Sequence, residues 1–97
     1  MSVDDNFSKI IKTERSVHNR IVYKYELRSF ESKNVASFGI VLYEICVEMK
    51  IKDSVTFYRT GGIFSDIERA LMFFDMIRKN LATPYDLPYI IEDCFSF

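Results

Sequence analysis

Residues 65–81 read SDIERALMFFDMIRKNL, and this stretch predicts one amphipathic helix around which the rest of the chain is arranged. Ser65 is the expected N-cap, because its hydroxyl can accept a hydrogen bond from the first turn, and Glu68 completes a capping box. At 3.6 residues per turn, one stripe of apolar side chains faces a core. Its members are Ile67, Ala70, Leu71, Phe74, Ile77 and Leu81.

A second apolar group, Met72, Phe73 and Met76, falls on the side of this helix away from the first stripe. A helix that covers one sheet needs only one apolar face. In the simpler interpretation, the second group packs beneath the N-terminal or C-terminal segment, with methionine filling irregular gaps. In the alternative it meets another chain, because exposed apolar patches usually mark partner sites. The second interpretation makes Met72, Phe73 and Met76 the candidate protein interface.

Three stretches before this helix have the pattern of β-strands. Residues 17–29 alternate apolar with mostly charged side chains, the period of two of a half-buried strand. Residues 35–49 carry apolar side chains on both faces, as a central strand does, and residues 54–60 resume the alternation. Because the connections are short, the three strands are expected to pair as an antiparallel meander.

The two ends of the chain carry the remaining expected elements. Apolar residues within residues 2–14 are spaced by three and four, which predicts a short amphipathic helix or an arm that orders on docking. Pro88 blocks a regular helix across the C-terminal segment, so the second helix is placed at residues 88–95. The predicted fold class is α+β: a three-stranded antiparallel meander followed by two helices packed on one sheet face. Residues 16–97 form this single domain and residues 1–15 the arm or short helix that precedes it.

Composition argues against several classes of function. The 97 residues are 48% apolar and 28% charged, which is typical of a soluble globular domain, and the net charge of −1 creates no strong field toward nucleic acid or anionic lipid. No apolar run approaches the roughly 18 residues that span a bilayer, and the acidic start MSVDDNFSK does not resemble a signal peptide. We therefore expect a cytoplasmic protein. Cys46 and Cys94 form no C-x-x-C pair and are expected to be small buried hydrophobes.

No constellation of residues for catalysis, a cofactor or a metal emerges from the pattern. The single histidine, His18, lies among charged residues without a candidate nucleophile, and one histidine with two isolated cysteines closes no metal site. Gly61-Gly62 lacks the lysine of a phosphate-binding loop and is expected to be a turn. A carboxylate cluster stays open, because four acidic side chains could converge in space. They are Glu44, Glu48, Glu92 and Asp93.

The alternative site is a basic strand face. Arg20, Lys24 and Arg28, with His18, share one face of the strand expected at residues 17–29, and a basic sheet with neighbouring aromatics can bind single-stranded nucleic acid. Glu26 interrupts this row, and no recognition-helix or RNA-platform signature accompanies it. Nucleic-acid binding is therefore the second hypothesis.

The later part of the chain resembles a known family. Gly39, Ile40 and Leu42, the charged connection and capped helix that follow, and the ending TPYDLPYIIED look like a family of small uncharacterised proteins from spore-forming Gram-positive bacteria. The similarity covers about residues 37–94. Its clearest positions are Thr83, Pro84, Leu87, Ile91, Glu92 and Asp93. The double glycine at residues 61–62 and the second proline at position 88 depart from that pattern. The resemblance implies a cytoplasmic bacterial protein and no particular activity.

The leading functional hypothesis is a non-enzymatic protein-binding module with a regulatory role, acting as a homodimer through Met72, Phe73 and Met76. It requires no cofactor, no metal and no membrane. A partner other than a second copy is not identified by the residues.

Overall fold

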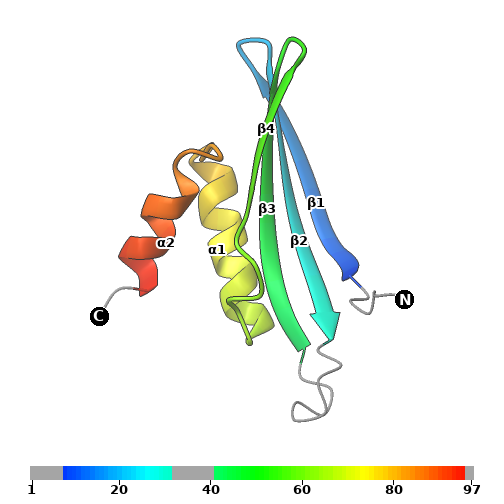
Figure 1. Ribbon diagram of the computed structural model, residues 1–97, viewed down its shortest axis with the longest axis vertical. Coiled ribbons are helices and arrows are strands. Elements are labelled where there is room, and N and C mark those ends of the chain that lie inside the picture. Colours follow the sequence, from blue (N-terminus) through cyan, green and yellow to red (C-terminus); the bar gives the residue numbers. More distant parts are fainter. Residues whose placement is uncertain (1–7, 32–40, 96–97) are drawn as a thin grey trace.

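The computed structural model describes residues 8–31 and 41–95 as a two-layer α+β fold. The elements are β1 (Ser8–His18), β2 (Ile21–Glu31), β3 (Val41–Ile51), β4 (Ser54–Arg59), α1 (Ile67–Lys79) and α2 (Leu87–Phe95). The strands form one antiparallel sheet in chain order, and both helices lie on the same side of it (Figure 1). The α+β class and the two helices on one face are confirmed. The sheet, however, has four strands in the described part of the chain, where the sequence predicted three.

The additional strand is β1, which occupies the segment predicted as an N-terminal helix or arm. That prediction is wrong for Ser8 onward, because the segment pairs with β2 along its length. The register shifts between Ile10 and Lys12, so Ile11 is the extra residue of a β-bulge. Residues 12–16 carry no apolar side chain, so β1 shows no period of two, and the adjacent Ile10 and Ile11 fit a helical spacing instead. Val3 and Phe7, which completed the pattern, lie outside the described residues.

A two-residue hairpin turn joins β1 to β2 at Asn19 and Arg20. Both residues adopt the left-handed backbone conformation, with φ of 51° and 67°, as a type I′ turn requires. The strand predicted at residues 17–29 is therefore divided between β1 and β2. Val17 pairs with Val22 on the sheet face away from the helices and is 65% exposed, whereas an unbroken alternation through residues 17–29 predicts it on the buried face with Tyr23.

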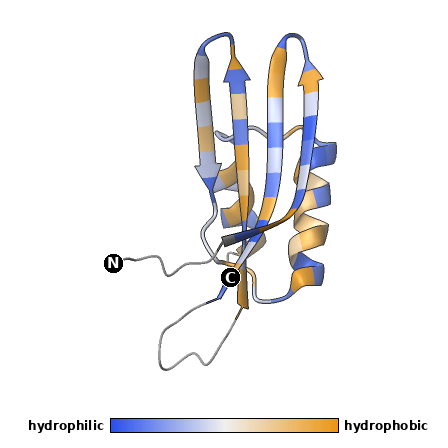
Figure 2. Cartoon of the chain, turned by 90° about the vertical axis from the view of Figure 1, so that its right-hand side faces the viewer, coloured by the Kyte–Doolittle hydropathy of each residue, from blue (hydrophilic) through white to orange (hydrophobic). Residues whose placement is uncertain are grey.

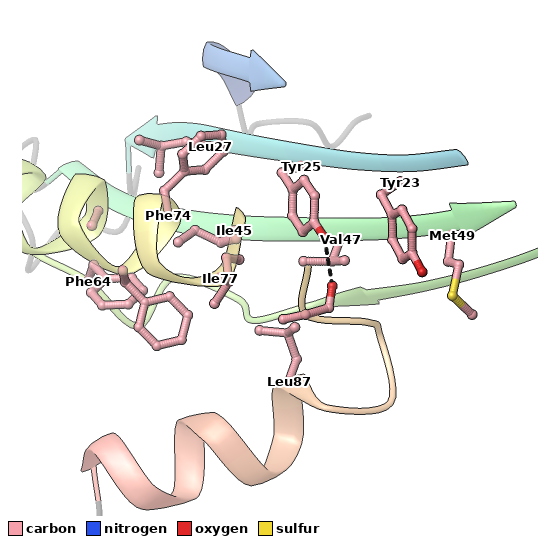
Figure 3. Close-up of a cluster of buried hydrophobic side chains, with 13 residues drawn as sticks. Tyr23, Tyr25, Leu27, Ile45, Val47, Met49, Phe64, Phe74, Ile77 and Leu87 are labelled. Carbon is pink, nitrogen blue, oxygen red and sulfur yellow. Dashed lines mark hydrogen bonds between the residues drawn. The ribbon is translucent and has the colours of Figure 1, made fainter. Parts of the chain in front are cut away.

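The core lies between the sheet and α1. Alternate residues of β2, namely Tyr23, Tyr25 and Leu27, face the helices and stand opposite Met49, Val47 and Ile45 of β3. From the helix layer, Phe74, Ile77 and Leu87 close the cluster, each at most 1% exposed (Figure 3). Burying each large apolar side chain stabilises the fold by roughly 1.5–3 kcal/mol, so this cluster fixes α1 on the sheet. The opposite face of the sheet has no helix over it among the described residues (Figure 2).

The boundaries of α1 differ slightly from the sequence prediction. Asp66, rather than Ser65, is the N-cap, and its carboxylate accepts a hydrogen bond from the Glu68 backbone N–H at 3.0 Å. A carboxylate at this position also suits the positive end of the helix dipole. The helix ends at Lys79, where Leu81 adopts a left-handed φ of 50° and the Ala82 N–H bonds to the Ile77 carbonyl at 2.9 Å. These bonds satisfy carbonyl groups at the helix end, as in a Schellman motif.

The second helix, α2, begins at Leu87, one residue before the predicted start. Pro88 lies in its first turn, where a missing N–H costs nothing. The Asp86 carboxylate accepts hydrogen bonds from the Thr83 backbone N–H at 2.9 Å and from its hydroxyl at 3.1 Å, which shapes the turn before the helix. Leu87 anchors one end of α2 in the core, and the Phe95 ring meets Phe64 at 5.6 Å at the other end. No helix among the described residues is long and apolar enough to cross a membrane.

Candidate protein-binding surface

The outward side of α1 carries the methionines that the sequence singled out. Met72 is 72% exposed and Met76 is 37% exposed, so we call these two residues the methionine ridge. Phe73, the third member of the predicted interface, is only 7% exposed. Its ring packs against Phe64 with centroids 5.2 Å apart. The second apolar group is therefore divided, with Phe73 in the core and the methionines at the surface.

Phe73 is buried because the ring of Phe64 packs against it. The segment after β4 returns along β3, where backbone hydrogen bonds join Tyr43 and Phe64 at 2.8 and 3.3 Å. This pairing places the Phe64 ring beneath α1, between that helix and the C-terminal end of α2. Phe64 is not among the core or interface residues predicted from the sequence. Phe64 directly precedes Ser65, the cap that the sequence predicted, and a hydrophobic staple is common at that position, which was the available signal.

A groove opens beside the methionine ridge, between α1 and α2, with a volume of about 410 Å³. Its lining is largely apolar and comes from both helices and from the segment before α1. The lining residues are Phe64, Arg69, Met72, Phe73, Met76, Cys94 and Phe95. A second hollow, of about 400 Å³, lies on the other side of the ridge and is lined by Asp75, Lys79 and Asn80 together with the two methionines. The ridge thus stands between two concave surfaces.

Each hollow beside the ridge is lined by one cation. Arg69 lines the groove near the start of α1, and Lys79 lines the second hollow near its end. Neither forms an ion pair within the part of the chain that the structure describes. Asp75, the carboxylate that lines the second hollow, lies 3.8 Å from the Lys12 ammonium and 3.5 Å from the Arg78 guanidinium. Its charge is therefore balanced locally, and Arg69 and Lys79 are the cations that a partner would meet at the two hollows.

The basic strand face that formed the alternative site is not assembled as expected. Arg20 lies in the β1–β2 turn and does not share a face with Lys24 and Arg28. The Glu26 carboxylate, on a residue 5% exposed, lies 3.6 Å from the Lys24 ammonium and accepts a hydrogen bond from Arg28 at 2.6 Å. Both cations are therefore engaged with one carboxylate.

Residues that could support chemistry are dispersed. Within residues 8–31 and 41–95, no cluster of three or more histidine, cysteine or acidic side chains could hold a metal. Glu44 and Glu48 lie on the sheet face away from the helices, whereas Glu92 and Asp93 lie on α2. His18 packs its ring against Tyr23 at 6.4 Å, on the helix side. Both cysteines are free, and burial raises the pKa of the Cys46 thiol, which makes it a poor nucleophile.

Comparison with known proteins decides the family. Residues 6–96 match the sequence model of a family of unknown function, DUF6514. The chain belongs to this family. The match includes the methionine ridge and both hollows, so this surface lies inside the DUF6514 region. Neither the curated proteins nor the solved structures contain a match to the chain.

Proposed function

We propose that this DUF6514 protein is a non-enzymatic protein-binding module of the bacterial cytoplasm, which regulates a larger partner by occupying its surface through the methionine ridge. The observation that carries the proposal is the 72% exposure of Met72 between two hollows. Covering a large apolar side chain that is this exposed removes apolar surface from water, which makes the free energy of binding a partner more favourable. Methionine suits this role because its flexible side chain adapts to the shape of the partner.

The charge pattern describes the partner. Arg69 and Lys79 flank the apolar centre of the ridge, so the complementary surface has apolar side chains in the middle and acidic side chains at both ends. An amphipathic helix with apolar residues one turn apart fits, because its side chains can enter the hollows on either side of the ridge. Such a partner binds more weakly as ionic strength rises.

The same pattern weighs against a second copy at this surface. A two-fold axis that places Met72 of one copy over Met76 of the other also places Arg69 over Lys79. Like charges in contact disfavour that arrangement. Self-association, which the sequence also predicted, is therefore proposed to use another surface.

The test is capture from an extract of the native cell with tagged wild-type protein and tagged ridge variants. Met72→Glu and Met76→Glu place a charge on the ridge, and we expect both to lose the captured partner. The matched control is Tyr89→Glu on α2, because Tyr89 is also 72% exposed and lines neither hollow. We expect this variant to capture the partner as the wild type does. Capture that is unchanged in both methionine variants, with their thermal melts intact, would overturn the proposal.

A further inference from the structure

No described segment pairs with the outer edge of β4, which is therefore open for pairing within residues 8–31 and 41–95. β4 reads SVTFYR, and its register with β3 is continuous from Ser54 to Arg59. Ile51 and Ser54 close the two-residue turn between the strands, so they exchange hydrogen bonds, and bonded pairs then alternate along the ladder. It follows that Val55 and Phe57 direct their backbone N–H and C=O groups away from β3. No other described backbone group bonds to them.

The two edges of the sheet differ in how they are protected. Natural sheets guard their edges with bulges and charged side chains. β1 has both, since it contains the bulge at Ile11 and several cations, among them Lys12 and Arg15. β4 has neither between Ser54 and Tyr58. The edge that lacks protection is therefore the one expected to pair with another strand.

Exposed apolar side chains flank the β4 edge on both faces of the sheet. On the face away from the helices, Val55 is 52% exposed and Phe57 is 62% exposed. On the helix side, Tyr85 is 63% exposed, and its hydroxyl lies 3.4 Å from the Thr56 hydroxyl. A strand added at this edge would cover apolar surface on both faces in addition to satisfying the outward backbone groups.

We propose that β4 pairs antiparallel with β4 of a second copy across a two-fold axis at Thr56, so that two sheets become one. In this register Val55 faces Phe57 of the other copy, a β-branched and aromatic pair that stabilises antiparallel strands. Thr56 faces its own symmetry mate. The outward groups of Val55 and Phe57 then bond to each other across the axis.

The second copy is the favoured occupant because β4 is complementary to itself. Residues 54–58 carry no charge, so two copies meet without repulsion, and Arg59 stays with Glu44 of its own chain. In a closed two-fold dimer, the edges left over from the described sheet are the two protected β1 strands, which ends the assembly at two copies.

The first test is mass in solution. We expect wild type to sediment at twice the 11.5 kDa mass of the chain. Phe57→Lys and Val55→Pro should both sediment as monomers, because one places a charge at the edge and the other removes an outward N–H while leaving the β3 pairing intact. Met76→Glu should remain a dimer. A monomeric wild type overturns the proposal, and so does a dimer that survives both edge variants. A dimer lost only in Met76→Glu assigns self-association to the methionine ridge instead.

The second test fixes the register. In a chain with Cys46→Ser and Cys94→Ser, Thr56→Cys places two cysteines opposite each other at a non-hydrogen-bonded pair, where Cα atoms about 4.5 Å apart suit a disulfide. We expect mild oxidation to yield a covalent dimer. The matched control is Thr13→Cys on the β1 edge, which should stay monomeric on a denaturing gel. Absence of the cross-link at position 56, or equal cross-linking at position 13, overturns the proposed arrangement.

Discussion

The hydroxyl of Tyr25 on β2 donates a hydrogen bond to the backbone carbonyl of Ala82, at 2.9 Å and 57 residues away in sequence (Figure 3). Tyr25 is fully buried and Ala82 is 3% exposed. This bond joins the sheet to the connection that positions α2. It also satisfies a carbonyl that would otherwise be buried without a partner.

Tyr25→Phe removes this bond and keeps the ring. We expect the free energy of unfolding to fall by about 1–3 kcal/mol, because the Ala82 carbonyl is then buried and unpaired. Urea denaturation of both proteins measures the difference. The control is Tyr89→Phe at an exposed position of α2, which should stay within about 0.5 kcal/mol of wild type. A loss for Tyr25→Phe no larger than that of the control would show that the bond contributes nothing.

Because Tyr25 is buried, the free energy of unfolding should also depend on pH. Burial, with smaller contributions from Tyr23 and Asp86, raises the pKa of Tyr25 from 10.0 to about 12. The folded state therefore keeps a proton that the unfolded state loses, so the contribution of Tyr25 to stability is complete below pH 10 and declines as the pH rises toward 12. Tyr25→Phe cannot titrate. The stability difference between wild type and this variant should narrow by roughly 1 kcal/mol per pH unit over that interval. A difference that is constant with pH contradicts the raised pKa.

Arg20→Gly should stabilise the protein by about 1 kcal/mol. Arg20 has a φ of 67° in the β1–β2 turn, and a non-glycine residue in the left-handed region is strained. Asn-Gly is the preferred pair for a type I′ turn. The comparison is Lys24→Gly within β2, which should destabilise because glycine weakens a strand interior. If one continuous strand ran through position 20, both glycine variants would destabilise, and thermal melts distinguish the two cases by sign.

Gly62→Ala should destabilise by about 1–3 kcal/mol through overpacking. A Cβ at this position would lie 2.7 Å from the tip of the Phe30 ring and 3.0 Å from the Leu42 Cβ. Phe30→Leu removes the nearer contact and should recover part of the loss in the double variant. Gly61 differs, because a Cβ there would meet no atom within 4 Å. Only its left-handed φ of 74° disfavours other residues. Gly61→Asn should therefore be tolerated far better than Gly62→Asn, and equal effects at the two positions would contradict the close approach.

Arg59→Met should destabilise by about 1–3 kcal/mol. The Glu44 carboxylate, on a residue only 3% exposed, accepts hydrogen bonds from the Arg59 guanidinium at 2.7 and 3.3 Å. Loss of Arg59 leaves this charge buried without its partner. The control is Arg15→Met on β1, an exposed position without an ion pair among the described residues, where little change is expected. Glu44→Gln added to Arg59→Met should recover stability, and no recovery would show that the buried charge is not the cause.

The sequence predicted a strand or helix best where its buried face was marked by a single regular apolar period. The alternation of Tyr23, Tyr25 and Leu27 and the helical spacing of Ala70, Phe74 and Ile77 placed these residues in the core, and the structure agrees. The predictions for β1 failed because residues 12–16 carry no apolar side chain, so no period of two was visible there. The β1–β2 turn was missed because Arg20 occupies a position that glycine normally marks.

The candidate site was predicted in part. Met72 and Met76 were selected from helical spacing alone and lie at the surface between two hollows. Phe73 was selected with them, but its ring is buried against Phe64. Helical spacing gives the direction of a side chain from its own helix. It does not tell which distant segment arrives to cover that side chain.

By itself, the sequence determined that this chain forms an α+β fold with an antiparallel sheet and two helices on one face, because periods of two and 3.6 residues encode buried faces locally. Only the tertiary structure decided that β1 joins the sheet, that the Phe64 ring covers Phe73 and leaves the methionines exposed, and that no described strand pairs with the outer edge of β4. Each of these depends on contacts between residues far apart in the chain, which form only when the whole core has packed.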